Sequence, residues 1–107
     1  MIDFWIKQGD TLPSLDAVLK DSKGTPVDLT TATAVRFDLR RSEGGTLLGG
    51  AAALRGGVAG GVRYNWAPAD TTIAGIYNGE FVVTFPGGKE ETFPSQDSIV
   101  VQVVPEV

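Results

Sequence analysis

The sequence predicts an all-β fold, namely a single domain of residues 1–107 built as an antiparallel β-sandwich of about seven strands. Short runs alternate apolar and polar side chains, as strands do when one face is buried and the other lies in water. No segment of about ten or more positions keeps the 3.6-residue apolar period of a helix. A chain of 107 residues with 42% apolar content has room for one hydrophobic core and little more.

Alternation begins in the first third of the chain. Leu15, Ala17 and Leu19 share one parity, and the sequence DSKG at 21–24 then supplies the Asp and Gly of a tight turn. Residues 35–40 alternate apolar and charged side chains, which predicts a strand with one face on the core. A slip by one residue would bury its charges, so we expect the register of this strand to be firmly set.

The middle of the chain, residues 43–61, contains four Gly-Gly pairs. A glycine-rich stretch can form a phosphate-binding loop, but such loops follow a strand, open a helix and usually continue into Lys-Ser/Thr, and none of these features is present. We expect one or two short strands instead, around Thr46–Leu48 and Ala51–Leu54. Turns and bulges that use the freedom of glycine at positive φ would connect them.

The next strand, residues 62–66, places large aromatic residues on one face. Tyr64 and Trp66 share their parity with Val62, and rings that alternate on one strand face are mostly buried. The sequence PADTTIAG then predicts a single helical turn, in which Asp70 accepts the N–H of Ile73 and Gly75 ends the turn.

A tyrosine follows this turn directly, at the head of a long alternating run. Asp70, the short turn and Gly75-Ile-Tyr77 have the form of a tyrosine corner, in which the tyrosine hydroxyl bonds to backbone upstream, here around residues 70–74. This feature indicates an immunoglobulin-like sandwich; Gly79 occupies the position of the cysteine in antibody domains. The alternative, that Tyr77 is a catalytic acid or a ligand contact, lacks a basic partner nearby. The predicted core is Leu15, Leu19, Val35, Phe37, Leu39, Tyr77, Phe81, Val83 and Phe85.

The PGGK sequence at 86–89 predicts a hairpin, and the run to Pro94 predicts its return strand. Both ends of the chain carry more apolar surface than one small sandwich needs. If Ile2, Phe4 and Ile6 enter the core, the residues between them face outward, and the same holds for the final strand, residues 98–104. A strand with unpaired edge groups and an apolar outer face tends to recruit another chain. We therefore predict an assembly contact centred on Trp5, with the hairpin tip at Gly87–Glu90 free. The predicted interface residues are Trp5, Lys7, Val100, Gln102 and Val104.

Composition argues against several classes of function. The chain has no cysteine, which excludes disulfides and thiolate chemistry, and no histidine, the residue used most often for proton transfer and metal binding. A net charge of −4 and scattered basic residues argue against nucleic acid as a partner. No long apolar stretch predicts a membrane span, and the N-terminus does not resemble a secretory signal. We expect neither a cofactor nor a metal.

Three landmarks, in order, suggest a family. They are Gln8-Gly9-Asp10-Thr11, then Pro26-Val27-Asp28-Leu29-Thr30, then a series that runs from Tyr64 through Asp70-Thr71, Gly75, Tyr77, Phe81 and Phe85 to Thr92-Phe93-Pro94. With these landmarks, nearly the whole chain resembles the immunoglobulin-like N-terminal domain of the upper baseplate proteins of tailed bacteriophages.

The resemblance implies a non-catalytic mounting module of a virion, made in the bacterial cytoplasm, that packs against neighbouring copies and other structural proteins. Such domains usually begin a longer protein, and this sequence ends at Val107. We therefore expect a short component of the baseplate, tail, neck or capsid surface.

The main alternative is a module that binds carbohydrate on the host surface. Many β-sandwiches present aromatic platforms to sugars, and Trp5, Tyr64 and Trp66 could form one. An enzyme is the least favoured class, because no catalytic constellation is evident in the sequence.

Overall fold

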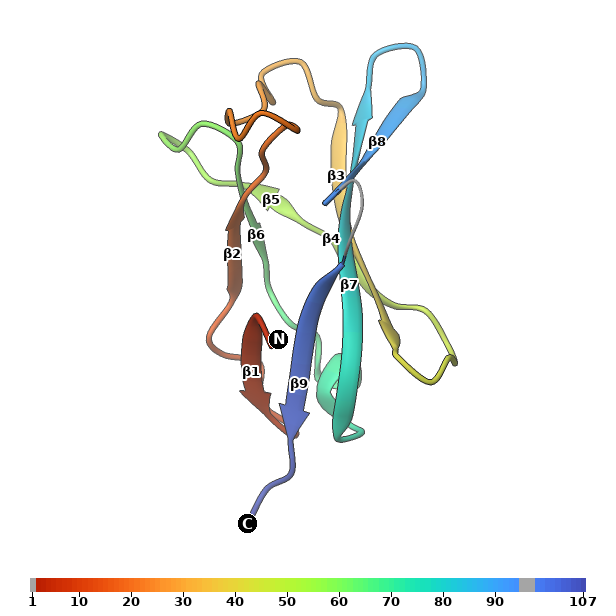
Figure 1. Ribbon diagram of the computed structural model, residues 1–107. Coiled ribbons are helices and arrows are strands. Elements are labelled where there is room, and N and C mark those ends of the chain that lie inside the picture. Colours follow the sequence, from red (N-terminus) through yellow and green to blue (C-terminus); the bar gives the residue numbers. More distant parts are fainter. Residues whose placement is uncertain (1, 95–97) are drawn as a thin grey trace.

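The computed structural model describes residues 2–94 and 98–107. These residues form nine strands and one short 3₁₀ helix, η1 (Figure 1). The elements are β1 (Phe4–Lys7), β2 (Leu15–Val18), β3 (Ala34–Arg41), β4 (Leu48–Ala51), β5 (Ala53–Leu54), β6 (Gly61–Tyr64), η1 (Pro68–Thr71), β7 (Gly75–Phe85), β8 (Lys89–Phe93) and β9 (Ile99–Val104).

The strands form two sheets that pack against each other, so the predicted all-β sandwich is confirmed (Figure 1). The larger sheet has the order β1-β9-β7-β3-β4, and β8 also pairs with β7. The smaller sheet has the order β2-β6-β5. The predicted helical turn is present as η1, which connects β6 of the smaller sheet to β7 of the larger one.

The strand count and the strand directions differ from the prediction. The hairpin return and the run from 98 to 104 are two strands, as predicted, but they share one side of β7: β8 pairs with Phe81–Phe85 and β9 with Gly75–Gly79. The glycine-rich segment contributes β4 and β5: β4 begins and ends later than the expected Thr46–Leu48, and β5 lies within the expected Ala51–Leu54. The sandwich is also not wholly antiparallel, because β1 runs parallel to β9. β1 is followed by a crossing to the smaller sheet, so no hairpin imposes the antiparallel direction.

Phe37 lies at the centre of the core. Its ring is fully buried and lies 4.8 Å from the ring of Phe81, 4.9 Å from Tyr64 and 5.9 Å from Trp66, measured between centroids. These contacts join the two sheets, because Phe37 and Phe81 belong to the larger sheet and Tyr64 to the smaller one. A Cβ at Gly79 would come within 2.5 Å of the Phe37 ring, so no side chain fits at that position.

The predicted core residues are buried, with one exception. Phe85, the last residue of β7, is only partly buried, because the β7–β8 hairpin extends past the smaller sheet (Figure 1). In the glycine-rich segment, Gly49 has a φ of +93° and a Cβ there would collide with the carbonyl of Phe37. Glycine therefore allows the backbone of β4 to lie close to the backbone of β3.

We expect Phe37→Ala to lower the free energy of unfolding by about 3–5 kcal/mol, because it opens a cavity where the two sheets meet. Phe85→Ala removes the same ring from a partly exposed site and is expected to cost clearly less. Urea denaturation of both variants measures the difference. Equal losses would contradict a central role for Phe37.

Candidate functional site

The predicted interface residues lie close together in the structure. In the parallel pairing of β1 with β9, Trp5 stands opposite Gln102 and Lys7 opposite Val104. Val100 lies two residues before Gln102 on the same side of β9. Trp5 is 57% exposed, Lys7 is exposed, and the three β9 residues are half-buried. We call this surface of Trp5, Lys7, Val100, Gln102 and Val104 the terminal face.

One part of that prediction was wrong: β9 is not an edge strand. It lies between β1 and β7 and pairs with both. The edge of the sheet is β1, because the chain folds its first strand against its last. Sequence periodicity shows which way side chains point but not which strand lies beside which, so the pairing could not be read from it.

The predicted tyrosine corner is formed. The hydroxyl of Tyr77 donates a hydrogen bond to the carbonyl of Ile73 at 2.5 Å, and the ring is buried. Burial raises the pKa of Tyr77, although the nearby Arg41 acts against this shift. The prediction that Gly75 ends the helical turn was wrong. η1 ends at Thr71, and Gly75 is the first residue of β7, with a φ of +150°.

The role predicted for Asp70 was also wrong. Asp70 is the third residue of η1, and its carboxylate points back along the chain instead of forward to Ile73. It accepts hydrogen bonds from the N–H of Ala67 at 2.9 Å, the hydroxyl of Tyr64 at 2.5 Å and the N–H of Gly49 at 3.2 Å. Asp70 is buried, with 3% exposed, and burial together with this carboxylate raises the pKa of Tyr64. The contact with Gly49 joins residues far apart in the sequence, so no local signal could have predicted it.

The three aromatic residues considered as a sugar platform do not lie together on the surface. Tyr64 and Trp66 are buried, with 3% and 4% exposed, and Trp66 packs edge-on against Tyr64 and Phe37. Trp5 is the one member of the three that is exposed. A platform of all three is therefore excluded.

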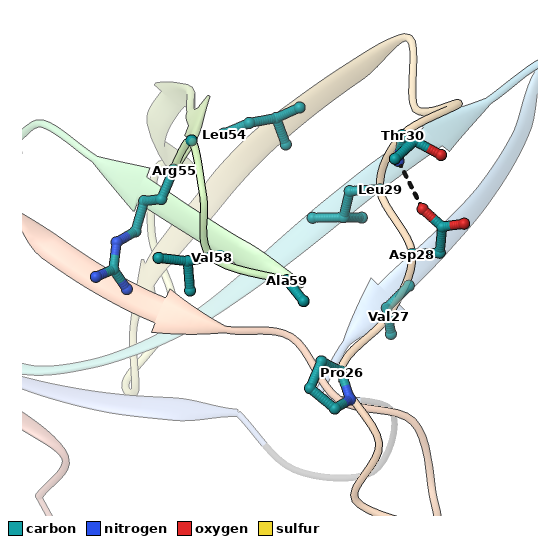
Figure 2. A pocket seen from close by; sticks show the side chains of 12 residues that line it. Pro26, Val27, Asp28, Leu29, Thr30, Leu54, Arg55, Val58 and Ala59 are labelled. Carbon is teal, nitrogen blue, oxygen red and sulfur yellow. Dashed lines mark hydrogen bonds between the residues drawn. The ribbon is translucent and has the colours of Figure 1, made fainter.

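An apolar groove that no sequence pattern predicted lies between two loop segments of the chain (Figure 2). The groove has a volume of about 360 Å³ and lies between residues 26–30 and residues 54–61. Leu54, Val58 and Leu29 line it. Its carboxylate, Asp28, already accepts the N–H of Thr30 at 3.0 Å, and this bond lowers the pKa of Asp28. The two segments meet only through the tertiary fold, and neither alternates clearly enough to show that it borders a groove.

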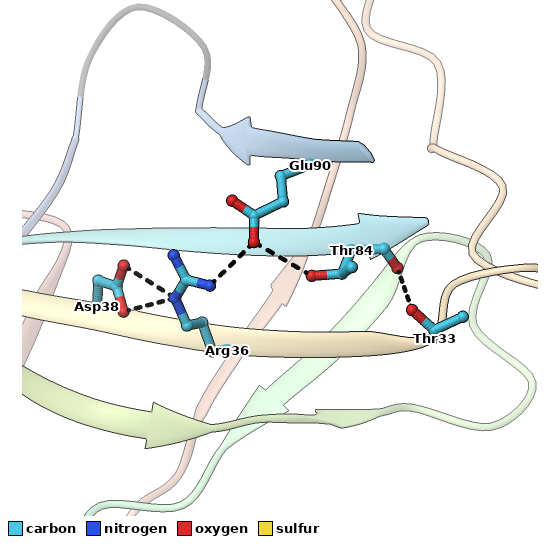
Figure 3. Close-up of polar contacts among 5 residues, drawn as sticks. All are labelled: Thr33, Arg36, Asp38, Thr84 and Glu90. Carbon is cyan, nitrogen blue, oxygen red and sulfur yellow. Dashed lines mark hydrogen bonds and ion pairs between the residues drawn. The ribbon is translucent and has the colours of Figure 1, made fainter. Parts of the chain in front are cut away.

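The outer face of the larger sheet near the hairpin is covered by its own charged network (Figure 3). Arg36 donates from Nε to Asp38 at 3.2 Å and from Nη1 to Glu90 at 3.3 Å. Glu90 was predicted to belong to a free hairpin tip, but its side chain is tied to β3 through Arg36. Val82 stands between Arg36 and Thr92 in the sheet and is buried. This end of the face is thus closed by polar side chains, in contrast to the terminal face.

The outer face of the smaller sheet carries a second ion pair. Arg63 on β6 donates to both oxygens of Asp16 on β2, at 2.7 and 2.9 Å, and Arg55 lies 3.9 Å from the same carboxylate. The hydrogen bond from Arg63 is the largest cause that lowers the pKa of Asp16 from 3.8 to about 2. Asp16 and Arg63 stand opposite each other in the register of β2 against β6, so the pair spans the two strands on the solvent side.

Among residues 2–94 and 98–107, no three His, Cys, Asp or Glu side chains are grouped so that they could hold a metal ion. No helix in this part of the chain is long and apolar enough to cross a membrane. Comparisons with protein-family models, curated proteins and solved structures found no match. The terminal face is therefore the candidate site on its own geometry.

Tyr77→Phe and Tyr64→Phe remove the same atom from two buried tyrosines. We expect Tyr77→Phe to cost about 1 kcal/mol, because a bond to a backbone carbonyl is lost. Tyr64→Phe is expected to cost about 1.5–3 kcal/mol, because it takes a donor from a buried carboxylate. Urea denaturation compares them; an unchanged midpoint for Tyr77→Phe would contradict the corner, and an equal cost would contradict the role given to Asp70.

Because of the ion pair of Asp16, the stability of the fold depends on pH, and the sign of this dependence follows from the lowered pKa. Because the folded-state pKa is depressed, the contribution of this carboxylate is complete above its ordinary pKa of 3.8 and is lost as the pH falls towards about 2. We expect the stability difference between wild type and Asp16→Asn to shrink over this range. Urea midpoints measured at several pH values test it, and a constant difference would contradict the pairing. The pKa of Asp28 is also lowered, so Asp28 too contributes less to stability as the pH falls. This loss occurs equally in wild type and in Asp16→Asn, so it cancels in their difference.

Proposed function

We propose that this chain is a non-catalytic structural module of a tailed-bacteriophage virion, which acts through protein–protein contacts made by the terminal face. The observation that carries the proposal is the exposure of Trp5 beside half-buried valines on a sheet whose outer face is otherwise charged and closed near the hairpin. Tryptophan is enriched among the residues that dominate interface energy.

The strand order supports an immunoglobulin-like architecture. In that fold, the second, fifth and fourth strands (B, E and D) lie in one sheet, the third, sixth and seventh (C, F and G) form the other, and the variable type adds a strand C′ beside C. The order β2-β6-β5 corresponds to B-E-D, and the order β9-β7-β3-β4 corresponds to G-F-C-C′. The tyrosine corner at the head of β7 belongs to the same architecture. This agrees with the fold of the baseplate domains that the sequence resembles.

The landmarks of the resemblance have structural roles. The N–H of Gly9 donates to the carbonyl of Thr71, and the hydroxyl of the buried Thr71 donates to the carbonyl of Asp10, both at 2.9 Å. The first landmark thus packs against the third. In the second landmark, Leu29 is part of the core and Asp28 caps its own turn. Residues that serve the fold in this way favour a scaffold over a site of chemistry.

The proposal is tested in the phage whose genome encodes the chain. We expect Trp5→Ala to reduce the amount of the chain in purified particles, while the isolated domain melts near the wild-type temperature, because Trp5 lies outside the core. Leu47→Ala is the matched control, since Leu47 is 51% exposed and lies outside the terminal face. Absence of the wild-type chain from particles would overturn the proposed function, and normal incorporation of Trp5→Ala would overturn the choice of surface.

A further inference from the structure

We propose that β1 pairs with β1 of a second copy of this chain, in antiparallel orientation across a two-fold axis that passes beside Trp5. The inference rests on the assembly role proposed for the terminal face, and it names the partner of that face. It is drawn from three features of β1: its position, the direction of its backbone groups and the order of its charges.

β1 is an unprotected edge of the larger sheet, whose other edges are β4 and β8. β8 carries Lys89, Glu90 and Glu91, and charged side chains on an edge discourage pairing with another chain. In β4, the N–H of Gly49 is already bonded to Asp70. β1 has one charged residue among four and an exposed tryptophan, so it is the edge best suited to accept a further strand.

The backbone of β1 offers hydrogen bonds at Trp5. The N–H of Gln8 donates to the carbonyl of Val104 at 2.8 Å, and in a regular ladder the backbone groups of Ile6 point the same way. Those of Trp5 and Lys7 then point away from β9. On that side the carbonyl of Lys7 already accepts the N–H of Asp10 at 3.0 Å, and at the other end of the segment the N–H of Asp3 donates to the carbonyl of Val100 in β9 at 2.8 Å. The backbone that is open to a further strand is therefore centred on Trp5. Two Trp5 residues facing each other could exchange both N–H···O bonds of an antiparallel pair.

The charges of this segment are self-complementary. When Trp5 stands opposite Trp5 of the second copy in an antiparallel pair, Asp3 stands opposite Lys7, and Lys7 opposite Asp3. Both residues are exposed, and Asp3 directly precedes β1, so the two opposite-charge pairs would lie at the two ends of the paired segment. This order of charges selects a second copy as the occupant over an unrelated strand.

Asp3 already makes a hydrogen bond within its own chain, in addition to the contact proposed with Lys7 of the second copy. Its Oδ2 accepts the N–H of Val100 at 2.8 Å, which holds the carboxylate at the start of β1. The flexible side chain of Lys7 from the second copy would reach it there.

The proposed association is weak in solution. Each exposed ion pair contributes little free energy, and a pairing of one short strand buries less than the roughly 1,000 Å² of a stable interface. The high local concentration in an assembly makes the association effective.

Exchanging the charges tests the pairing with the purified chain. Asp3→Lys places two lysines opposite each other, and Lys7→Asp places two aspartates opposite each other, so each variant alone is expected to self-associate about tenfold more weakly than wild type. An equimolar mixture of the two variants restores both opposite-charge pairs and is expected to associate as wild type does. Sedimentation equilibrium up to the millimolar range measures all three samples.

The double variant Asp3→Lys/Lys7→Asp is the control for loss of the Asp3 bond to Val100. It lacks that bond, as Asp3→Lys does, but restores the charge order and is expected to dimerise. Trp5→Ala is expected to abolish self-association, and Leu47→Ala to leave it unchanged. A wild-type chain that stays monomeric throughout, or a dimer that Trp5→Ala and the charge variants do not affect, would overturn this inference. Incorporation of Trp5→Ala into particles tests the proposed function separately, because it does not require that the partner be a second copy.

Discussion

The buried carboxylate of Asp70 is the interaction on which the rest of this sandwich depends. It receives hydrogen bonds from β6 of the smaller sheet, from β4 of the larger sheet and from the connection between β6 and η1. A buried carboxylate without partners would cost far more free energy than a small domain can tolerate, so the three donors must stay in place together. The position of η1 relative to both sheets is thereby fixed.

Hydrogen bonds from η1 and the residues just after it also hold β7 and the end of β1 in place. Ile73, just after η1, presents its carbonyl to Tyr77 at the head of β7, and Thr71 binds the backbone of Gly9 and Asp10 just after β1. Gln8 adds a side-chain bond to the carbonyl of Thr72 at 2.7 Å. β1 therefore leaves the sheet at a fixed point, and its register against β9 keeps Trp5 beside Gln102. The exposed terminal face is thus held by the same polar centre that joins the sheets.

The surfaces of the domain differ in how far their side chains find partners within the chain. Arg36 and Glu90 close the larger sheet near the hairpin, and Asp16 and Arg63 pair across the smaller one. These charges meet their partners within the chain. Trp5 has no comparable cover, and its strand has an open edge. A scaffold needs rigid, internally paired surfaces and at least one surface left for a neighbour, and this distribution provides both.

The sequence by itself determined the strand faces, most of the core and the tyrosine corner. Alternation in a strand depends only on the two-residue period of its side chains, so Val35, Phe37 and Leu39 could be placed inside and Trp5 outside without knowledge of their neighbours. The corner could be predicted because Tyr77 and Ile73 are four residues apart. Only the tertiary structure decided that β1 lies parallel to β9, that Asp70 reaches Gly49 and that two distant segments enclose an apolar groove. Those features depend on which strands become neighbours, and this choice follows from the packing of the whole core, which no local period encodes.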